Sequence, residues 1–260
     1  MHILHTTPRT DGFCMPAEFD RHAGCLLIWP TRGDSWRSGG WPARKAFAAV
    51  AAAIARSEEV TMLVAPEQYE TARAMLPPEV RLVEMETDDS WARDVCPTFV
   101  RNAEGTVRGI DWGFNAWGGL VDGLYFPWDK DNHAARKVCD LYRADCYDSR
   151  DFILEGGSIH SDGEGTILTT ESCLCSAGRN PDMTKAEIEA ALLAQDEMLV
   201  FETYTEIAGT NVVSRYVTYL PVNDGKDRAS LHSAVEAAKA LKDQPSEEFT
   251  LTSFDGLALK

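Results

Sequence analysis

The hydrophobic pattern of the chain alternates between the period of helices and the period of strands. Residues 44–56 carry apolar side chains on one helical face, namely Phe47, Val50, Ala51 and Ile54. Residues 59–65 form an apolar run of the kind found in buried strands. Further helices are predicted at 66–76, 131–142 and 182–194, and further strands at 81–86, 99–100, 106–112, 152–155 and 166–170. The recurring order of strand, strand, helix and strand indicates an α/β fold built from similar small modules.

Two local signals mark where predicted elements begin and end. The sequence Asn-Ala-Glu-Gly at 102–105 is typical of a turn, and we expect it to join the strands on either side. The helix at 182–194 is preceded by Asn180, Pro181 and Asp182, so its N-cap is expected at Asn180 or Asp182.

Composition and charge restrict the class of ligand. The 260 residues carry a formal net charge of -16, which argues against nucleic acid as a partner and would attract a small cation. No apolar run is long enough for a membrane span, and the start, Met1 to His5, lacks the features of a secretory signal, so we expect a cytoplasmic protein. The seven scattered cysteines do not form a disulfide framework, and Cys173 and Cys175 lack the spacing of a zinc knuckle, so no metal site is expected.

Two short segments bring acids together with rings or glycines. Residues 88–94 read Asp-Asp-Ser-Trp-Ala-Arg-Asp, and residues 154–160 read Leu-Glu-Gly-Gly-Ser-Ile-His. Glu155 ends an apolar strand, and the glycine pair after it allows a close backbone approach, so its carboxylate is buried or faces a ligand. Asp94 is expected at a strand entry with its carboxylate in a cleft. Two carboxylates and an indole face suit a planar guanidinium, which makes forked hydrogen bonds and stacks on rings.

A loop rich in aromatic residues and glycine lies between two predicted elements. Residues 112–119 read Trp-Gly-Phe-Asn-Ala-Trp-Gly-Gly, which does not favour a helix or a strand. Such loops often carry function. The alternative is that the tryptophans only pin the loop onto the core.

Several motifs in a fixed order resemble one known family. They are Met15-Pro16-Ala17-Glu18-Phe19, Trp29-Pro30, residues 89–94, 111–119, 124–129 and 154–160, Thr169-Thr170-Glu171 and residues 178–181. Over about residues 13–195 the chain is similar to the agmatine deiminase family, relatives of bacterial peptidyl-arginine deiminases. The resemblance implies a pentein-type fold, an α/β propeller of strand-strand-helix-strand modules, here incomplete. It divides the chain into a pentein-like guanidine-binding region at 1–195 and an unmatched region at 196–260 with a strand at 212–220 and an amphipathic helix at 228–242.

The resemblance also implies a reaction and site residues. In that family a cysteine thiolate attacks the guanidinium carbon, ammonia leaves, and water hydrolyses the thiouronium intermediate, giving N-carbamoylputrescine from agmatine for putrescine biosynthesis without a cofactor. By resemblance Asp94 and Glu155 are the catalytic carboxylates. The residues expected to bind the substrate are Asp89, Trp91, Asn115 and Trp117.

The family's histidine and cysteine segments are not found in this sequence. After residue 195 its only histidine is His232, and its last cysteine is Cys175. Cys96 is a candidate substitute nucleophile, because residues two apart on a strand share a face and Arg93 could lower its pKa. Against this, free cysteines are mostly inert, and no base lies beside it in sequence.

Three interpretations remain open at the level of sequence. The chain is an agmatine deiminase, a catalytically inactive guanidine-binding or regulatory protein, or a hybrid chain with unpaired strand edges. Peptidyl-arginine is the alternative substrate to agmatine. The expected partner is a small cationic guanidine rather than nucleic acid or a membrane, and a homo-oligomer is left open.

Overall fold

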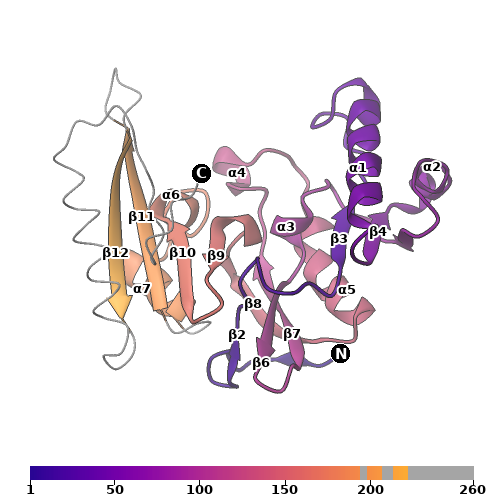
Figure 1. Cartoon of the computed structure of the whole chain (residues 1–260). Coiled ribbons are helices and arrows are strands. Elements are labelled where there is room, and N and C mark those ends of the chain that lie inside the picture. The colour runs from indigo at the N-terminus through magenta and orange to yellow at the C-terminus, as the bar shows by residue number, and fades with distance from the viewer. Residues whose placement is uncertain (194–197, 207–212, 222–260) are drawn as a thin grey trace, which may run out of the picture.

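Three small β-sheets with short helices around them make up the described part of the protein. This computed structural model describes residues 1–193, 198–206 and 213–221. The sheets follow one another across the molecule from the right of Figure 1 to the left. The predicted α/β class is confirmed.

The first sheet is parallel and carries the longest helix of the described residues. Its strands are β3 (Cys25–Ile28), β4 (Val60–Val64) and β5 (Arg81–Glu84), in that order. The helices that follow its strands are α1 (Trp41–Ile54), after the 3-10 turn η1 (Ser38–Gly40), and α2 (Tyr69–Met75), after η2 (Pro66–Gln68). β4 is buried along its whole length, as predicted, because it lies between two strands and packs against both helices. Val50 was predicted on the buried face of α1 and is instead 49% exposed.

The second sheet is mixed and occupies the middle of the molecule. Its order is β1 (Ile3–Leu4), β8 (Asp145–Ile153), β7 (Val107–Gly113), β6 (Thr98–Asn102) and β2 (Phe13–Cys14). β6 and β7 are antiparallel and joined by the predicted turn, where Gly105 has a φ of 81°. η3 (Asp131–His133) leads into α5 (Ala134–Leu141), which packs on this sheet. β8 is longer than the strand predicted at 152–155, because its first half is rich in charged and polar residues and hides the pattern.

The third sheet joins a hairpin to strands from the C-terminal part of the chain. Its strands are β9 (Ile159–Ser161), β10 (Thr166–Thr170), β11 (Met198–Glu206) and β12 (Val213–Pro221). β10 agrees with its prediction at both ends, and β12 is shifted by one residue. β11 was not predicted; it pairs with β10 in parallel. The helix predicted at 228–242 lies outside the described residues, and the division of the chain at residue 195 stays a prediction.

The helix α7 (Lys185–Leu193) begins later than predicted. Its N-terminus is a capping box, in which Thr184 Oγ1 accepts from the Glu187 N–H and Glu187 Oε2 accepts from the Thr184 N–H at 2.7 Å. Asn180 is therefore not the cap: its side chain bonds both backbone groups of Ile153. Asp182 is not the cap either. Two further short helices are α4 (Gly119–Asp122) and α6 (Glu171–Leu174).

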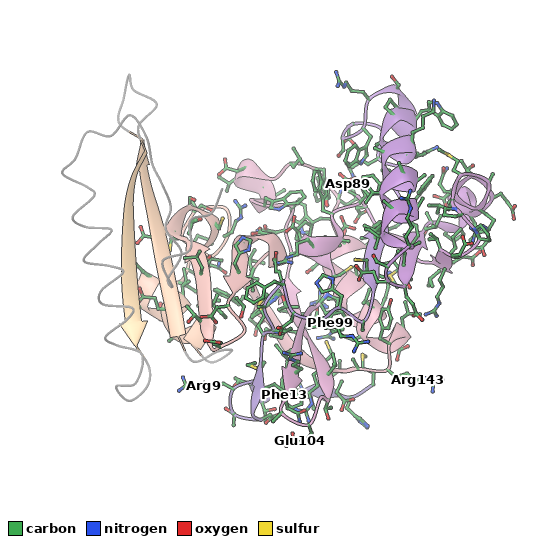
Figure 2. All side chains as sticks on the ribbon, in the orientation of Figure 1. Arg9, Phe13, Asp89, Phe99, Glu104 and Arg143 are labelled. Atoms are coloured by element: carbon green, nitrogen blue, oxygen red, sulfur yellow. The ribbon has the colours of Figure 1, made fainter. Side chains whose placement is uncertain are left out.

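Two short elements meet between the sheets. The helical turn α3 (Ala92–Val95) contacts the 3-10 turn η4 (Gly156–Ser158). Side chains fill the space between the sheet ribbons in Figure 2, where Asp89, just before α3, is labelled. Within the described residues no helix is both long and apolar enough to cross a membrane.

Candidate active site

Asp94 lies in a helical turn and not at a strand entry. Its N–H and that of Val95 both donate to the carbonyl of Trp91, which closes α3. The carboxylate points toward η4, where Asp94 Oδ1 accepts from the N–H of Gly157 at 2.8 Å. The expectation of a strand entry was wrong because the four residues 92–95 coil before β6 begins.

The glycine pair after Glu155 brings η4 against α3. A Cβ atom on Gly157 would overlap Asp94 Oδ1, and one on Gly156 would overlap the carbonyl oxygen of Arg93. Only glycine therefore allows this separation of the two backbones. The predicted close approach at this pair is confirmed, and it places Glu155 beside Asp94.

Glu155 is buried and Asp94 is half-buried, and desolvation is the main influence on the pKa of each. It raises the pKa of Asp94, against the opposing effects of the Gly157 N–H, Trp117 and nearby arginines. Burial likewise raises the pKa of Glu155, which is 1% exposed, while Arg179 opposes the shift and the charge of Asp94 adds to it. Each acid thus disfavours ionisation of the other, and a cation between them would favour ionisation of both.

Arg179 already supplies one guanidinium to this pair. Its Nε donates to Glu155 Oε1 at 3.0 Å, and its side chain is only 14% exposed. The sequence alone did not single out this arginine as a site residue. The contact depends on the loop after α6 folding back over η4.

Arg93 hydrogen-bonds to the turn η4, which contains the glycine pair. Its Nε donates to the carbonyl of Gly156 at 2.9 Å, and its guanidinium forms an ion pair with Glu18. His160 lies 3.5 Å from the same Glu18 carboxylate and is 59% exposed at its side chain. This histidine thus lies in β9, directly after the turn η4.

Three tryptophans form an aromatic corner beside Asp94. Trp91 stacks on Trp36 with ring centroids 5.7 Å apart and meets Trp117 edge-on at 5.5 Å. Trp91 is 37% exposed, so part of its indole face is open to a ligand. The sequence pattern did not indicate Trp36 as a site residue. Its contact with Trp91 joins segments more than fifty residues apart.

Asp89 holds this corner in place. Its two carboxylate oxygens accept from the indole N–H groups of Trp36 at 2.8 Å and Trp91 at 2.9 Å. Asp89 is 1% exposed and also accepts from the N–H of Ser90. Both carboxylate oxygens of Asp89 are thus engaged within the protein, and its contact with a substrate stays a prediction.

The loop with Trp117 is held in an uncommon backbone conformation. Ala116 and Trp117 have φ angles of 55° and 66°, which side-chain-bearing residues adopt rarely. The Trp117 ring packs edge-on against Phe114 and Tyr125. Trp117 therefore anchors the loop, and its side chain also reaches the Asp94 carboxylate. Its role in substrate binding stays a prediction.

Asn115 ties this loop to the segment that carries Arg179. Its Nδ2 donates to the carbonyl of Gly178 at 2.7 Å, and its backbone carbonyl accepts from the N–H of Gly119. The amide nitrogen of Asn115 is thus engaged within the protein. Its Oδ1 is buried and meets no donor among the described residues.

Cys96 does not share the face of Asp94. It follows the helical turn, so the alternation of a strand does not apply, and its side chain belongs to a core cluster with Val95, Phe114 and Ala134. Burial raises the pKa of its thiol far above the usual range, and the charge of Asp131 adds to this effect. This environment disfavours the thiolate that a nucleophile needs.

The fold and the site define an α/β protein of the pentein type with one buried and one half-buried carboxylate beside a tryptophan corner, and solved structures of the same type support the fold. The chain belongs to the Porphyromonas-type peptidyl-arginine deiminase family, whose model matches residues 14–203. The resemblance inferred from the sequence motifs is confirmed as membership of this family.

Several individual relatives are named agmatine deiminase, which is more specific than the name of the family. "Putative agmatine deiminase 1" of Listeria monocytogenes serotype 4b is 59% identical over 192 residues, covering 74% of this chain and 53% of the relative. The agmatine deiminase of Pseudomonas fluorescens is 56% identical over 193 residues, covering 74% and 52%. The solved agmatine deiminase of Enterococcus faecalis is 48% identical with a TM-score of 0.76, covering 78% of this chain and 56% of that one. The chain spans about half the length of the curated relatives it matches.

Proposed function

We propose that the chain binds the guanidinium group of agmatine at Asp94 and Glu155, with the exposed face of Trp91 covering its plane. The observation that carries this proposal is the pairing of a buried acid, Glu155, with a half-buried acid, Asp94, beside an aromatic corner. Buried carboxylates disfavour their own charge, so a cation that pairs with both is bound strongly. The internal contact of Arg179 with Glu155 supports the choice of a guanidinium, since the same carboxylate already accepts from one.

The reaction proposed for this site is hydrolysis of agmatine to N-carbamoylputrescine and ammonia. A thiolate displaces ammonia from the guanidinium carbon, and water then splits the thiouronium. The two carboxylates orient the cation and disperse its charge toward the leaving amine. The relatives named agmatine deiminase favour agmatine over peptidyl-arginine. We place this chemistry in the cytoplasm, on a free small molecule and without a cofactor.

A second candidate function is guanidine binding without turnover. The burial of Cys96 favours it, because that thiol is poorly suited to attack a ligand at Asp94. Ammonia release from agmatine by the purified chain distinguishes the two candidates. Release supports the enzyme, and a Cys96→Ser variant that keeps the wild-type rate would exclude Cys96 as nucleophile. Binding of agmatine without release supports the second candidate.

A matched pair of ligands tests the binding itself. Agmatine and 1,4-diaminobutane share the same four-carbon diamine skeleton, but only agmatine carries a guanidinium. Agmatine should raise the melting temperature of the chain in a concentration-dependent way, because a ligand that binds only the folded state stabilises it. 1,4-Diaminobutane should have a much smaller effect. Equal shifts with both ligands, or no shift with agmatine, would overturn the proposal.

A further inference from the structure

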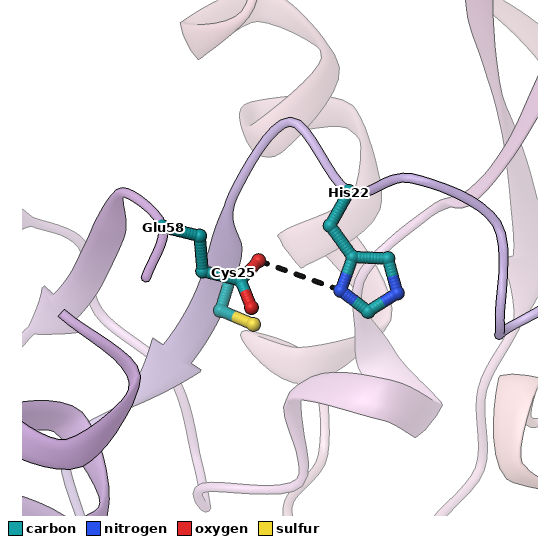
Figure 3. A group of neighbouring side chains, drawn as sticks. All are labelled: His22, Cys25 and Glu58. Carbon is teal, nitrogen blue, oxygen red and sulfur yellow. Dashed lines mark ion pairs between the residues drawn. The ribbon is translucent and has the colours of Figure 1, made fainter. Parts of the chain in front are cut away.

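Three potential metal ligands converge where the chain enters β3 of the first sheet. His22 Nδ1, Cys25 Sγ and a carboxylate oxygen of Glu58 all lie within 4.8 Å of one another. His22 Nδ1 is 3.4 Å from Glu58 Oε2. Figure 3 shows the three side chains pointing toward a common space, two of them from the segment that enters β3 and one from beyond α1.

The backbone holds these residues together independently of any ligand. The N–H of Cys25 donates to the carbonyl of Glu59 at 2.8 Å, and Glu58 N donates to the carbonyl of Ile54 at the end of α1. A Cβ atom on Gly24 would come within 2.8 Å of the Glu59 carbonyl oxygen, so the two segments are in close contact. The cluster is therefore preorganised by the pairing of β3 with β4.

The imidazole of His22 is oriented as a metal ligand. Its Nε2 lies 2.8 Å from the carbonyl oxygen of Glu18. A carbonyl only accepts, so Nε2 carries the proton, and in the neutral ring the lone pair of Nδ1 faces Glu58. A histidine that ligates a metal commonly donates its other N–H to a carbonyl in this way.

The oxygen that faces His22 lacks an ordinary partner. Glu58 Oε2 is buried, and no donor in the described part of the chain meets it with hydrogen-bond geometry. A buried carboxylate oxygen without a donor is costly, and a cation would compensate it.

We propose that His22, Cys25 and Glu58 bind a divalent transition-metal ion, for which Zn²⁺ is the best match. One thiolate and one carboxylate neutralise the double charge, and thiolate and imidazole are ligands that Zn²⁺ prefers. On binding, a metal–sulfur bond forms and the thiol proton passes to solvent. Three protein ligands leave a fourth position for water. That position faces an open groove lined by Asp20, Arg21, Ala23, Ser57 and Glu59 in addition to His22 and Glu58.

Titration of the full, metal-free chain with Zn²⁺ and with Co²⁺ tests the proposal. The wild type should bind one equivalent, and its Co²⁺ form should show a thiolate charge-transfer band with the intense visible absorption of tetrahedral cobalt. Each of the variants His22→Ala, Cys25→Ser and Glu58→Gln should weaken Zn²⁺ binding by at least about tenfold. Even residues that only hydrogen-bond to a metal ligand change the metal affinity by about 10–100-fold when they are mutated. Binding should release at least one proton at neutral pH, measured by calorimetry in buffers of different ionisation enthalpy.

Two matched variants control for the other thiols and histidines. His5→Ala and Cys175→Ser change exposed residues elsewhere, and should leave the affinity unchanged. His22→Ala removes a side chain that is 51% exposed, so the metal-free fold should melt as the wild type does. Absence of Zn²⁺ binding, or binding that survives His22→Ala and Cys25→Ser, would overturn the proposal. Agmatine binding should be unaffected in these variants, which separates this site from the function proposed above.

Discussion

Asp94 and Glu155 are two acids that the fold keeps side by side, with Glu155 buried and Asp94 half-buried. The sequence indicated both of them, because an acid next to a glycine pair or a tryptophan is unusual. It did not indicate Arg179 or Trp36, which reach the same site from other parts of the chain. Contacts of this kind depend on how whole segments pack, and no local pattern encodes them.

Asp131 offers a test of the electrostatics at the scale of one residue. It is buried, and burial raises its pKa to about 6, although Tyr125 and the backbone N–H groups of residues 88 and 89 donate to it. In the unfolded chain an aspartate has a pKa of about 3.9. The folded protein therefore binds this proton more tightly, so the stabilisation from protonation is complete below about pH 4 and is lost as the pH rises through about 6.

Asp131→Asn should remove this pH dependence. The free energy of unfolding of the wild type minus that of the variant should fall by up to about 3 kcal/mol between pH 4 and pH 7, as urea denaturation at several pH values would show. Asp129→Asn, at an exposed position nearby, serves as the control and should give a constant difference. A constant difference for Asp131→Asn as well would show that its carboxyl titrates normally.

At the scale of elements, the sequence predicted the regular segments and missed the short or charged ones. β4 and β10 follow clear apolar patterns and were predicted. β1 and β2 have two residues each, too few for any period to show. The first half of β8 was not predicted, because its acidic residues interrupt the apolar pattern of a strand. The turns α3 and η4, which carry the site, were not predicted, because their geometry is set by mutual contact and not by periodicity.

The contact between α3 and η4 makes Gly157 a sensitive position. In Gly157→Ala the new methyl group would overlap Asp94 Oδ1, so the two turns must move apart. We expect a loss of about 1–3 kcal/mol in the free energy of unfolding and weaker agmatine binding. Gly33→Ala is the matched control, since a Cβ there would have no other described heavy atom within 4 Å. Wild-type stability and affinity in Gly157→Ala would contradict the close approach.

At the scale of the whole molecule, the described chain holds three sheets of a fold whose curated relatives are about twice as long. The family resemblance was visible in the sequence because its motifs lie at loops and turns with specific residues. The spatial placement of those motifs required the structure. The net charge of -16 is consistent with attraction of a cationic ligand but does not identify one.

Calorimetric titration of agmatine into the wild-type chain, Asp94→Asn and Glu155→Gln tests the central claim most directly. Each variant keeps the shape of the side chain and removes its charge. We expect each of the two variants to lose about 1.5–3 kcal/mol of the free energy of agmatine binding, because this is the usual contribution of a hydrogen bond to a charged group. Asp182→Asn and Glu164→Gln, at surface positions, should bind as the wild type does, and melting curves would establish that all variants are folded. Unchanged agmatine affinity in folded Asp94→Asn and Glu155→Gln would contradict the assignment of this site.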